Sequence, residues 1–251
     1  MTGSGAGNPL VTGAVRYAQD VELPEMLHAR LVRCPYPHAR VLRVDASAVP
    51  DGVVCLTPDD VRDLRTYGCQ IKDQSVLVLD RARFAGDVVA AVAAETPRLA
   101  EEAAALVEVE YEELPAVLSL ADALAGERLV HERIPVSDND AAYFDMRPQQ
   151  GTNVCHRFRI VHGDAAAAME RADVVVEGTF ATAAAQQAPM EPHATLARWT
   201  DERLELWTGT QTPFNVRQDV AGVFGLPEDR VRVVSPPMGG SFGAKTFVHL
   251  E

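Results

Sequence analysis

The sequence predicts an α+β fold made of two units in series, at residues 1–125 and 153–251. Short apolar segments that alternate with helix-start signals indicate mixed strands and helices in both units. Between them, at residues 126–152, the hydrophobic periodicity fades and turn-forming residues accumulate, which predicts a connector. A chain of 251 residues is long enough to bury a core without disulfides or metal ions.

The first unit is expected to contain five strands and two helices. In two places a Thr-Pro pair starts a helix, because Thr caps the N-terminus and Pro suits the first turn. These pairs begin at Thr57 and Thr96, and the second helix extends to about Leu106, with Leu99, Ala103 and Leu106 on its apolar stripe. The expected strands are 26–33, 39–45, 52–56, 88–94 and 107–111.

The second unit is expected to begin with a short helix at 165–171, capped by Asp164, and a strand at 174–181. The elements expected after these are a hairpin of strands 194–199 and 204–208, a helix from Thr212-Pro213 to about Phe224 closed by Gly225, and a strand at 231–234. The last strand leads into a Gly-rich loop, and such a loop normally leads onward to a helix. Since the chain ends soon afterwards, we expect the domain to be interrupted there.

The composition argues against several classes of function. The net charge is −13, and no run of Lys or Arg could displace phosphate counterions, so nucleic acid is not an expected partner. The N-terminus lacks a secretory signal and apolar runs such as 88–94 are too short to cross a bilayer, which predicts a cytoplasmic protein without a membrane partner. No two cysteines have CxxC spacing, which argues against zinc and iron–sulfur sites and predicts buried, reduced thiols. The four cysteines are Cys34, Cys55, Cys69 and Cys155.

The loop at residues 239–246 is the strongest candidate for a binding site. Its three glycines allow backbone N–H groups to approach an anionic or oxo group closely. The simpler alternative is a plain surface turn. The segment also nearly fits the phosphate-loop pattern G-x-x-x-x-G-K-[ST], with Ala244 in place of the second glycine. A nucleotide-binding protein is therefore a further alternative.

Two other segments could supply polar contacts. Gln211 precedes a helix N-terminus, where its side-chain amide could meet a ligand oxygen, or else bond to nearby backbone. Within residues 190–193, Glu191 is expected to form an ion pair and His193 to cap a turn, because their spacing does not suit a zinc-binding helix. A serine hydrolase is not indicated, since there is no G-x-S-x-G elbow.

Taken together, these segments resemble the large, molybdopterin-binding subunit of the xanthine dehydrogenase/aldehyde oxidase family. The first unit looks like the family's a/b hammerhead domain, and residues 153–251 resemble the start of its molybdopterin-binding α+β domain. Order and spacing carry the resemblance more than any single motif does. The matching segments are GAVRYAQD (13–20), LPEMLHA (23–29), PHAR (37–40), RFAGDVVAAV (83–92), AEEA (100–103), VEVEYE (107–112), MEPH (190–193), Thr210-Gln211 and MGGSFGAK (238–245).

The resemblance implies a molybdenum–molybdopterin cofactor and a role for this chain in a multi-subunit oxidoreductase. Members of the family hydroxylate an aldehyde or an aromatic N-heterocycle with water-derived oxygen, or oxidise carbon monoxide. The expected partners are a C-terminal molybdopterin-binding part, an iron–sulfur subunit and an FAD subunit, with a small molecule as substrate. The cofactor-binding residues that it implies are Gln211, Gly239, Gly240, Ser241, Phe242, Gly243 and Ala244, with Gln211 and Phe242 near the molybdenum centre and no direct metal ligand.

Some positions depart from the family pattern. Ser241 and Ala244 stand where glycines are usual, and Thr246 replaces a Glu of some purine oxidisers, which weakens the case for a purine substrate. The family's general-base glutamate and most pterin contacts lie beyond residue 251, so this chain is expected to hold no catalytic residue and to be inactive alone. A hammerhead-fold module that only binds or assembles partners is the alternative from a different functional class.

Overall fold

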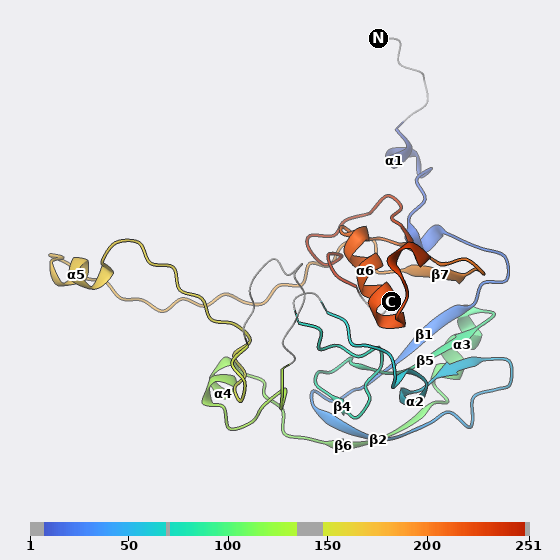
Figure 1. The fold of residues 1–251 in the computed structure, drawn as a ribbon, viewed down its shortest axis with the longest axis horizontal. Helices are drawn as coiled ribbons and strands as arrows, with labels where there is room; N and C mark the ends of the chain where they lie inside the picture. The colour runs from blue at the N-terminus through green and yellow to red at the C-terminus, as the bar shows by residue number, and fades with distance from the viewer. Residues whose placement is uncertain (1–7, 69–70, 135–147, 249–251) are drawn as a thin grey trace, which may run out of the picture.

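The computed structural model describes residues 8–68, 71–134 and 148–248. It confirms the α+β class. Two three-stranded sheets form the body of the first unit, and a third three-stranded sheet with a long helix forms the second. A long arm that carries a short helix, α5, extends away from both units (Figure 1).

Both sheets of the first unit are antiparallel, with strand orders β1-β5-β3 and β4-β2-β6. The strands are β1 (His28–Arg33), β2 (Ala39–Asp45), β3 (Val54–Leu56), β4 (Arg81–Ala82), β5 (Val88–Ala94) and β6 (Glu108–Glu113). The helices are α1 (Pro9–Thr12), η1 (Ala18–Asp20), α2 (Pro58–Val61), α3 (Pro97–Ala104) and α4 (Leu120–Ala125). All five expected strands and both Thr-Pro helix starts are confirmed, whereas β4 and the helices α1, η1 and α4 were not predicted.

Strand β5 is central to the first unit because its sequence, VVAAVAA, is apolar on both faces. Val89 packs in a core cluster with residues of β2 and β4, whereas Ala90 and Val92 pack in a second cluster that includes α3. A continuous apolar run is what a strand covered on both faces requires.

Helix α3 buries a different face from the predicted one. Ala100 and Ala103 are its buried residues, whereas Leu106 lies beyond the helix end and is 41% exposed. The predicted stripe through Leu99, Ala103 and Leu106 is therefore wrong in part. The reason is that small side chains let the helix approach Ala90 and Val92 of β5 closely, as residues of the same cluster.

The second unit places a helix against a mixed sheet. Strand β8 pairs antiparallel with β7 and parallel with β9, and leucines of β8 share a core cluster with residues of α6 and β9. The helix ends where Gly225 adopts a left-handed conformation with φ of 65°, as its position predicted. The elements are α5 (Ala165–Glu170), β7 (Thr195–Trp199), β8 (Leu204–Thr208), α6 (Pro213–Phe224), η2 (Glu228–Arg230) and β9 (Val231–Val234).

The arm, defined here as residues 154–188, contains α5 but no strand. Asp164 caps α5 as predicted by accepting the N–H of Ala167 at 2.9 Å. The strand predicted at 174–181 is wrong, because this segment forms no backbone hydrogen bonds with another part of the described chain. Its apolar side chains are instead exposed, up to 94% at Phe180.

The prediction that the cysteine thiols are buried is wrong in part. Cys34 is buried as expected, but Cys155 is exposed at the base of the arm, where no core covers it. Both are free thiols, as is Cys55, whereas Cys69 lies outside the described residues, as does His249.

The two units touch through α6. The N–H of Arg65 donates to the carbonyl of Val223 at 3.4 Å, and Lys72 forms an ion pair with Asp219. Among the described helices, none has the length and apolar character needed to cross a bilayer. The cytoplasmic location and the domain boundaries at 125 and 153 stay predictions.

Candidate functional site

The Gly-rich loop at 239–246 follows β9 and turns sharply. Gly240 and Gly243 have φ values of 110° and 90°, and Phe242 has a φ of 51° although it is not glycine. A bulky residue rarely adopts this conformation, and such strain of about 1–3 kcal/mol is concentrated at functional sites. The Phe242 side chain is 77% exposed, so the loop presents an aromatic ring outward.

Four consecutive N–H groups of this loop, those of residues 240–243, donate to no acceptor in the described chain, although Ser241 among them is only 6% exposed. The N–H groups on either side are used: Gly239 donates to Glu191 Oε2 at 2.7 Å, and Ala244 donates to the carbonyl of Ser241 at 2.8 Å. Those of residues 240–243 have no acceptor within 8–68, 71–134 or 148–248. Successive N–H groups in such a turn form a concave site for an anionic or oxo group.

Gln211 lies against this loop, although thirty residues separate it from Ser241. Its side-chain oxygen accepts hydrogen bonds from the hydroxyls of Ser241 and Thr246, the second at 2.9 Å. Its backbone N–H donates to the carbonyl of Lys245 at 2.9 Å. Because the amide oxygen is already occupied, the exposed side chain is left with its NH₂ group as a donor. The structure therefore brings together Gln211 and the predicted loop residues.

Glu191 and Lys245 form an ion pair behind the loop. The distance from Lys245 Nζ to Glu191 Oε2 is 2.7 Å, and their side chains are 1% and 4% exposed for the lysine and glutamate respectively. The predicted ion pair of Glu191 is thus confirmed, but neither residue was predicted to serve the loop. The buried lysine also argues against the phosphate-loop alternative, since a phosphate-binding lysine must reach its ligand.

The glycines of the loop serve different purposes. A Cβ atom at Gly239 would lie 2.8 Å from Cβ of Glu191, and one at Gly240 would lie 3.3 Å from the Phe242 ring and 3.4 Å from Pro189. Glycine is needed at positions 239 and 240 because neighbouring protein atoms leave no room for a side chain there. At Gly243 a Cβ atom would meet nothing within 4 Å, so a ligand can approach the backbone there.

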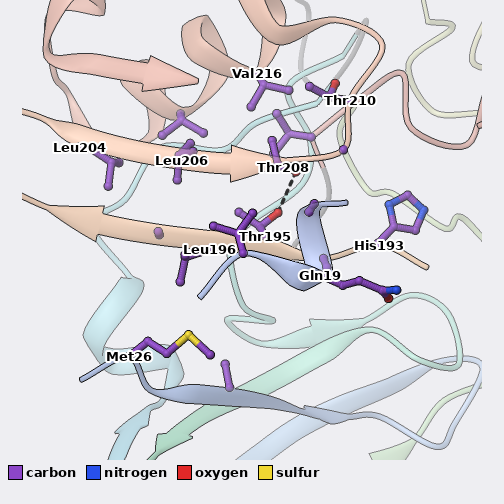
Figure 2. Close-up of a pocket in the computed structure, with 18 of the residues that line it drawn as sticks. Gln19, Met26, His193, Thr195, Leu196, Leu204, Leu206, Thr208, Thr210 and Val216 are labelled. Carbon is purple, nitrogen blue, oxygen red and sulfur yellow. Dashed lines mark hydrogen bonds between the residues drawn. The ribbon is translucent and has the colours of Figure 1, made fainter. Parts of the chain in front are cut away.

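An apolar groove lies apart from the loop, between the two units. It has a volume of about 890 Å³, and it is lined by η1 and β1 of the first unit and by β7, β8 and α6 of the second (Figure 2). Met26, Leu204 and Val216 are among the largely apolar side chains that line it, whereas Gln211 and residues 239–244 do not. The groove therefore resembles an interface for packing more than a reaction site.

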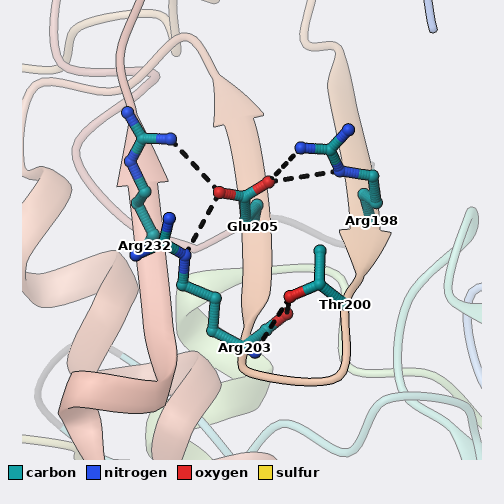
Figure 3. Close-up of polar contacts among 5 residues, drawn as sticks. All are labelled: Arg198, Thr200, Arg203, Glu205 and Arg232. Carbon is teal, nitrogen blue, oxygen red and sulfur yellow. Dashed lines mark hydrogen bonds and ion pairs between the residues drawn. The ribbon is translucent and has the colours of Figure 1, made fainter.

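A cluster of arginines surrounds Glu205 in the third sheet (Figure 3). Its carboxylate is buried and accepts hydrogen bonds from Arg198, Arg203 and Arg232, which lie on or beside the three strands. The hydrogen bonds from Arg198, followed by those from Arg232, lower the pKa of Glu205 from 4.5 to about 2, although desolvation opposes this. Through these ion pairs Glu205 of β8 is linked to both neighbouring strands, β7 and β9. Elsewhere in the described residues, no group of three His, Cys, Asp or Glu side chains could hold a metal ion.

Comparisons with known proteins match both units. Residues 12–115 match the model of the aldehyde oxidase and xanthine dehydrogenase a/b hammerhead domain, and residues 146–251 match the model of the molybdopterin cofactor-binding domain. The chain is 33% identical to a probable xanthine dehydrogenase subunit of Bacillus subtilis, over 98% of this chain and 31% of that protein. It is 34% identical to the nicotinate dehydrogenase large molybdopterin subunit of Eubacterium barkeri, over 96% of this chain and 54% of that protein.

A solved structure supports the same relationship. The crystal structure of quinoline 2-oxidoreductase from Pseudomonas putida matches with a TM-score of 0.77 and 35% identity, over 94% of this chain and 30% of that one. The chain thus spans from under a third to about half the length of these relatives. The two matched domains stand in the order that the sequence predicts.

Proposed function

Because the chain belongs to the xanthine dehydrogenase/aldehyde oxidase family, we propose that it forms part of the large subunit of a molybdenum hydroxylase and binds molybdenum–molybdopterin through the loop at 239–246. One observation carries this proposal most directly. The N–H groups of residues 240–243 donate to nothing in the described chain, and Gln211, whose side-chain oxygen accepts from the hydroxyl of Ser241, keeps its NH₂ as a further donor.

These residues fit the chemistry of the cofactor. Molybdenum–molybdopterin presents oxo and phosphate oxygens, which accept hydrogen bonds, and the unpaired N–H groups of residues 240–243 are donors that suit them. The open space at Gly243 allows close approach, and the exposed ring of Phe242 can cover a flat group. When bound, the cofactor supplies the two-electron oxidation chemistry, while residues of this chain hold and orient it.

The proposed reaction is the hydroxylation of an aldehyde or an aromatic N-heterocycle with water-derived oxygen, or the oxidation of carbon monoxide. The names of relatives support this range, since they act on nicotinate and quinoline and include a carbon monoxide dehydrogenase of Hydrogenophaga pseudoflava. The loop residues supply hydrogen-bond donors and no general base. We therefore propose that turnover needs a C-terminal complement, defined as the part of the relatives' subunits beyond the matched region.

The surface of the chain supports a docking role for this complement. The arm exposes apolar side chains such as Ile160 and Phe180, at 85% and 94%, on backbone without strand partners. The apolar groove between the units is a second unfilled surface. Monomeric proteins rarely expose such surfaces. Iron–sulfur and FAD subunits are proposed as the further partners that carry electrons away.

Purification of the assembled complex tests the proposal. The chain is tagged and isolated with the chains that copurify, and molybdenum and pterin are measured against protein. We expect both in a ratio near one per copy of this chain. Full assembly without either would favour the alternative of a binding or assembly module, and failure to release the metal on disrupting residues 239–246 would place the cofactor elsewhere.

A further inference from the structure

Burying the charges of Glu191 and Lys245 costs free energy, so an ion pair here is an inefficient means of stabilising the fold. Both charges lose their hydration, and an attraction between them offsets this only when further hydrogen bonds are well placed. A packed apolar pair of similar volume is often equally stable. The side chains are 4% and 1% exposed, so the desolvation is nearly complete. A role in setting geometry therefore accounts for the pair better than stability does.

The pair connects the two ends of the Gly-rich loop. Glu191 Oε2 accepts the N–H of Gly239 at the start of the loop and the ammonium of Lys245 at its end, each at 2.7 Å. A single carboxylate oxygen therefore sets the separation between these ends. The segment around Glu191 lies close to the loop as well, because its own N–H donates to the carbonyl of Gly239 at 3.4 Å.

The main chain of Lys245 extends this connection to Gln211. Its N–H donates to the hydroxyl of Ser241 at 3.0 Å, and its carbonyl accepts the N–H of Gln211 at 2.9 Å and the hydroxyl of Thr210 at 3.2 Å. Because Glu191 holds the side chain of Lys245, the main chain of Lys245 is fixed as well. The positions of Ser241 within the loop and of Gln211 beside it therefore depend on the ion pair. Since neither charged group is accessible to a ligand, the pair can affect ligand binding only by setting the position of the loop.

We propose that Glu191 and Lys245 are positioning residues for cofactor binding, which rests on the proposed function of the loop. The pair holds the loop ends at the separation at which the N–H groups of residues 240–243 and the amide of Gln211 face a single ligand. Glu205 provides a matched comparison, because it is a buried carboxylate paired with arginines in the same unit but is not bonded to the loop.

The test uses the double variant Glu191→Leu/Lys245→Met. A single change would leave one buried charge unpaired, whereas the double change removes both charges at similar volume and keeps the fold. Glu205→Gln is the control. Hydrogen exchange of the backbone amides of Lys245 and Gln211 is measured on the free chain, because neither amide bonds to the altered carboxylate. Molybdenum and pterin are measured on the assembled complex.

We expect the double variant to unfold cooperatively, with exchange of both amides faster by about tenfold or more, since the loop loses hydrogen bonds to a charged group. Bound molybdenum should fall by a similar factor. Glu205→Gln should keep the wild-type molybdenum content, and the exchange of its two amides relative to the core amides of β8 should match the wild type. Wild-type exchange rates or wild-type molybdenum content in the folded double variant would overturn the proposal. A wild-type complex without molybdenum would instead refute the proposed function, whatever the exchange rates.

Discussion

The hydroxyl of Ser241 donates a hydrogen bond to the side-chain oxygen of Gln211 and accepts the backbone N–H of Lys245 at 3.0 Å. A hydroxyl has a single proton, so accepting from Lys245 leaves that proton for the glutamine. The hydroxyl of Thr246 lies 2.9 Å from the same oxygen and 3.0 Å from the carbonyl of Gly243, so its single proton is shared between these two acceptors. This orientation of the amide therefore depends on a side chain that a glycine at position 241 could not supply.

Removing these hydroxyls should therefore weaken the function of Gln211. We predict that Ser241→Ala and Thr246→Val each lower kcat of the assembled complex by about fivefold, as expected for the loss of one neutral hydrogen bond. Molybdenum content should change less than kcat. Ser235→Ala is the control, because its hydroxyl donates to the carbonyl of Thr210 and not to Gln211. Equal losses in the control would contradict the specific role of Ser241.

Gly239 should tolerate no side chain. A Cβ atom there would lie 2.8 Å from Cβ of Glu191, so Gly239→Ala should lower the free energy of unfolding by about 1–3 kcal/mol. Gly222 in α6 has open space around it, and Gly222→Ala should instead raise the free energy of unfolding by about 0.5–1 kcal/mol. Urea denaturation of the two purified variants measures both. The steric argument fails if Gly239→Ala is as stable as wild type.

Glu205 should make the stability of the chain depend on acid pH. Its pKa is about 2 in the folded state and near 4.5 otherwise, so the unfolded chain takes up the proton first as pH falls. The stabilisation is thus complete above about pH 4.5 and is lost between about pH 4.5 and pH 2. Glu205→Gln should be less stable at pH 7 and should show a shallower fall over this interval. Thermal unfolding from pH 7 to pH 2 measures the difference, and parallel curves would contradict it.

The arm should matter for assembly and not for folding of the free chain. We predict that Ile160→Asp/Phe180→Asp changes the free energy of unfolding by less than about 0.5 kcal/mol per site, because both side chains are exposed. Association with the C-terminal complement should weaken by at least about tenfold, since two apolar anchors are lost. Leu118→Asp, at an exposed site outside the arm, is the control. Binding titrations that give equal affinities for all three chains would refute this role.

Local signals in the sequence determined most elements of this protein. The Thr-Pro pairs at 57 and 96, the cap at Asp164 and the glycine at 225 each act within a few residues, so helix starts and ends could be predicted from them. The order of short motifs likewise indicated the family. These features need no knowledge of the tertiary structure.

Tertiary structure alone decided the features that depend on distant neighbours. The apolar segment at 174–181 has the composition of a strand, but a strand forms only where another chain segment pairs with it. Nothing in the spacing of Glu191 and Lys245, which are 54 residues apart, indicates that they share a buried site. The orientation of the Gln211 amide depends on two hydroxyls that only folding places beside it. Pairing, burial of charge and amide orientation are set by three-dimensional contacts, and these are what make the loop a candidate binding site.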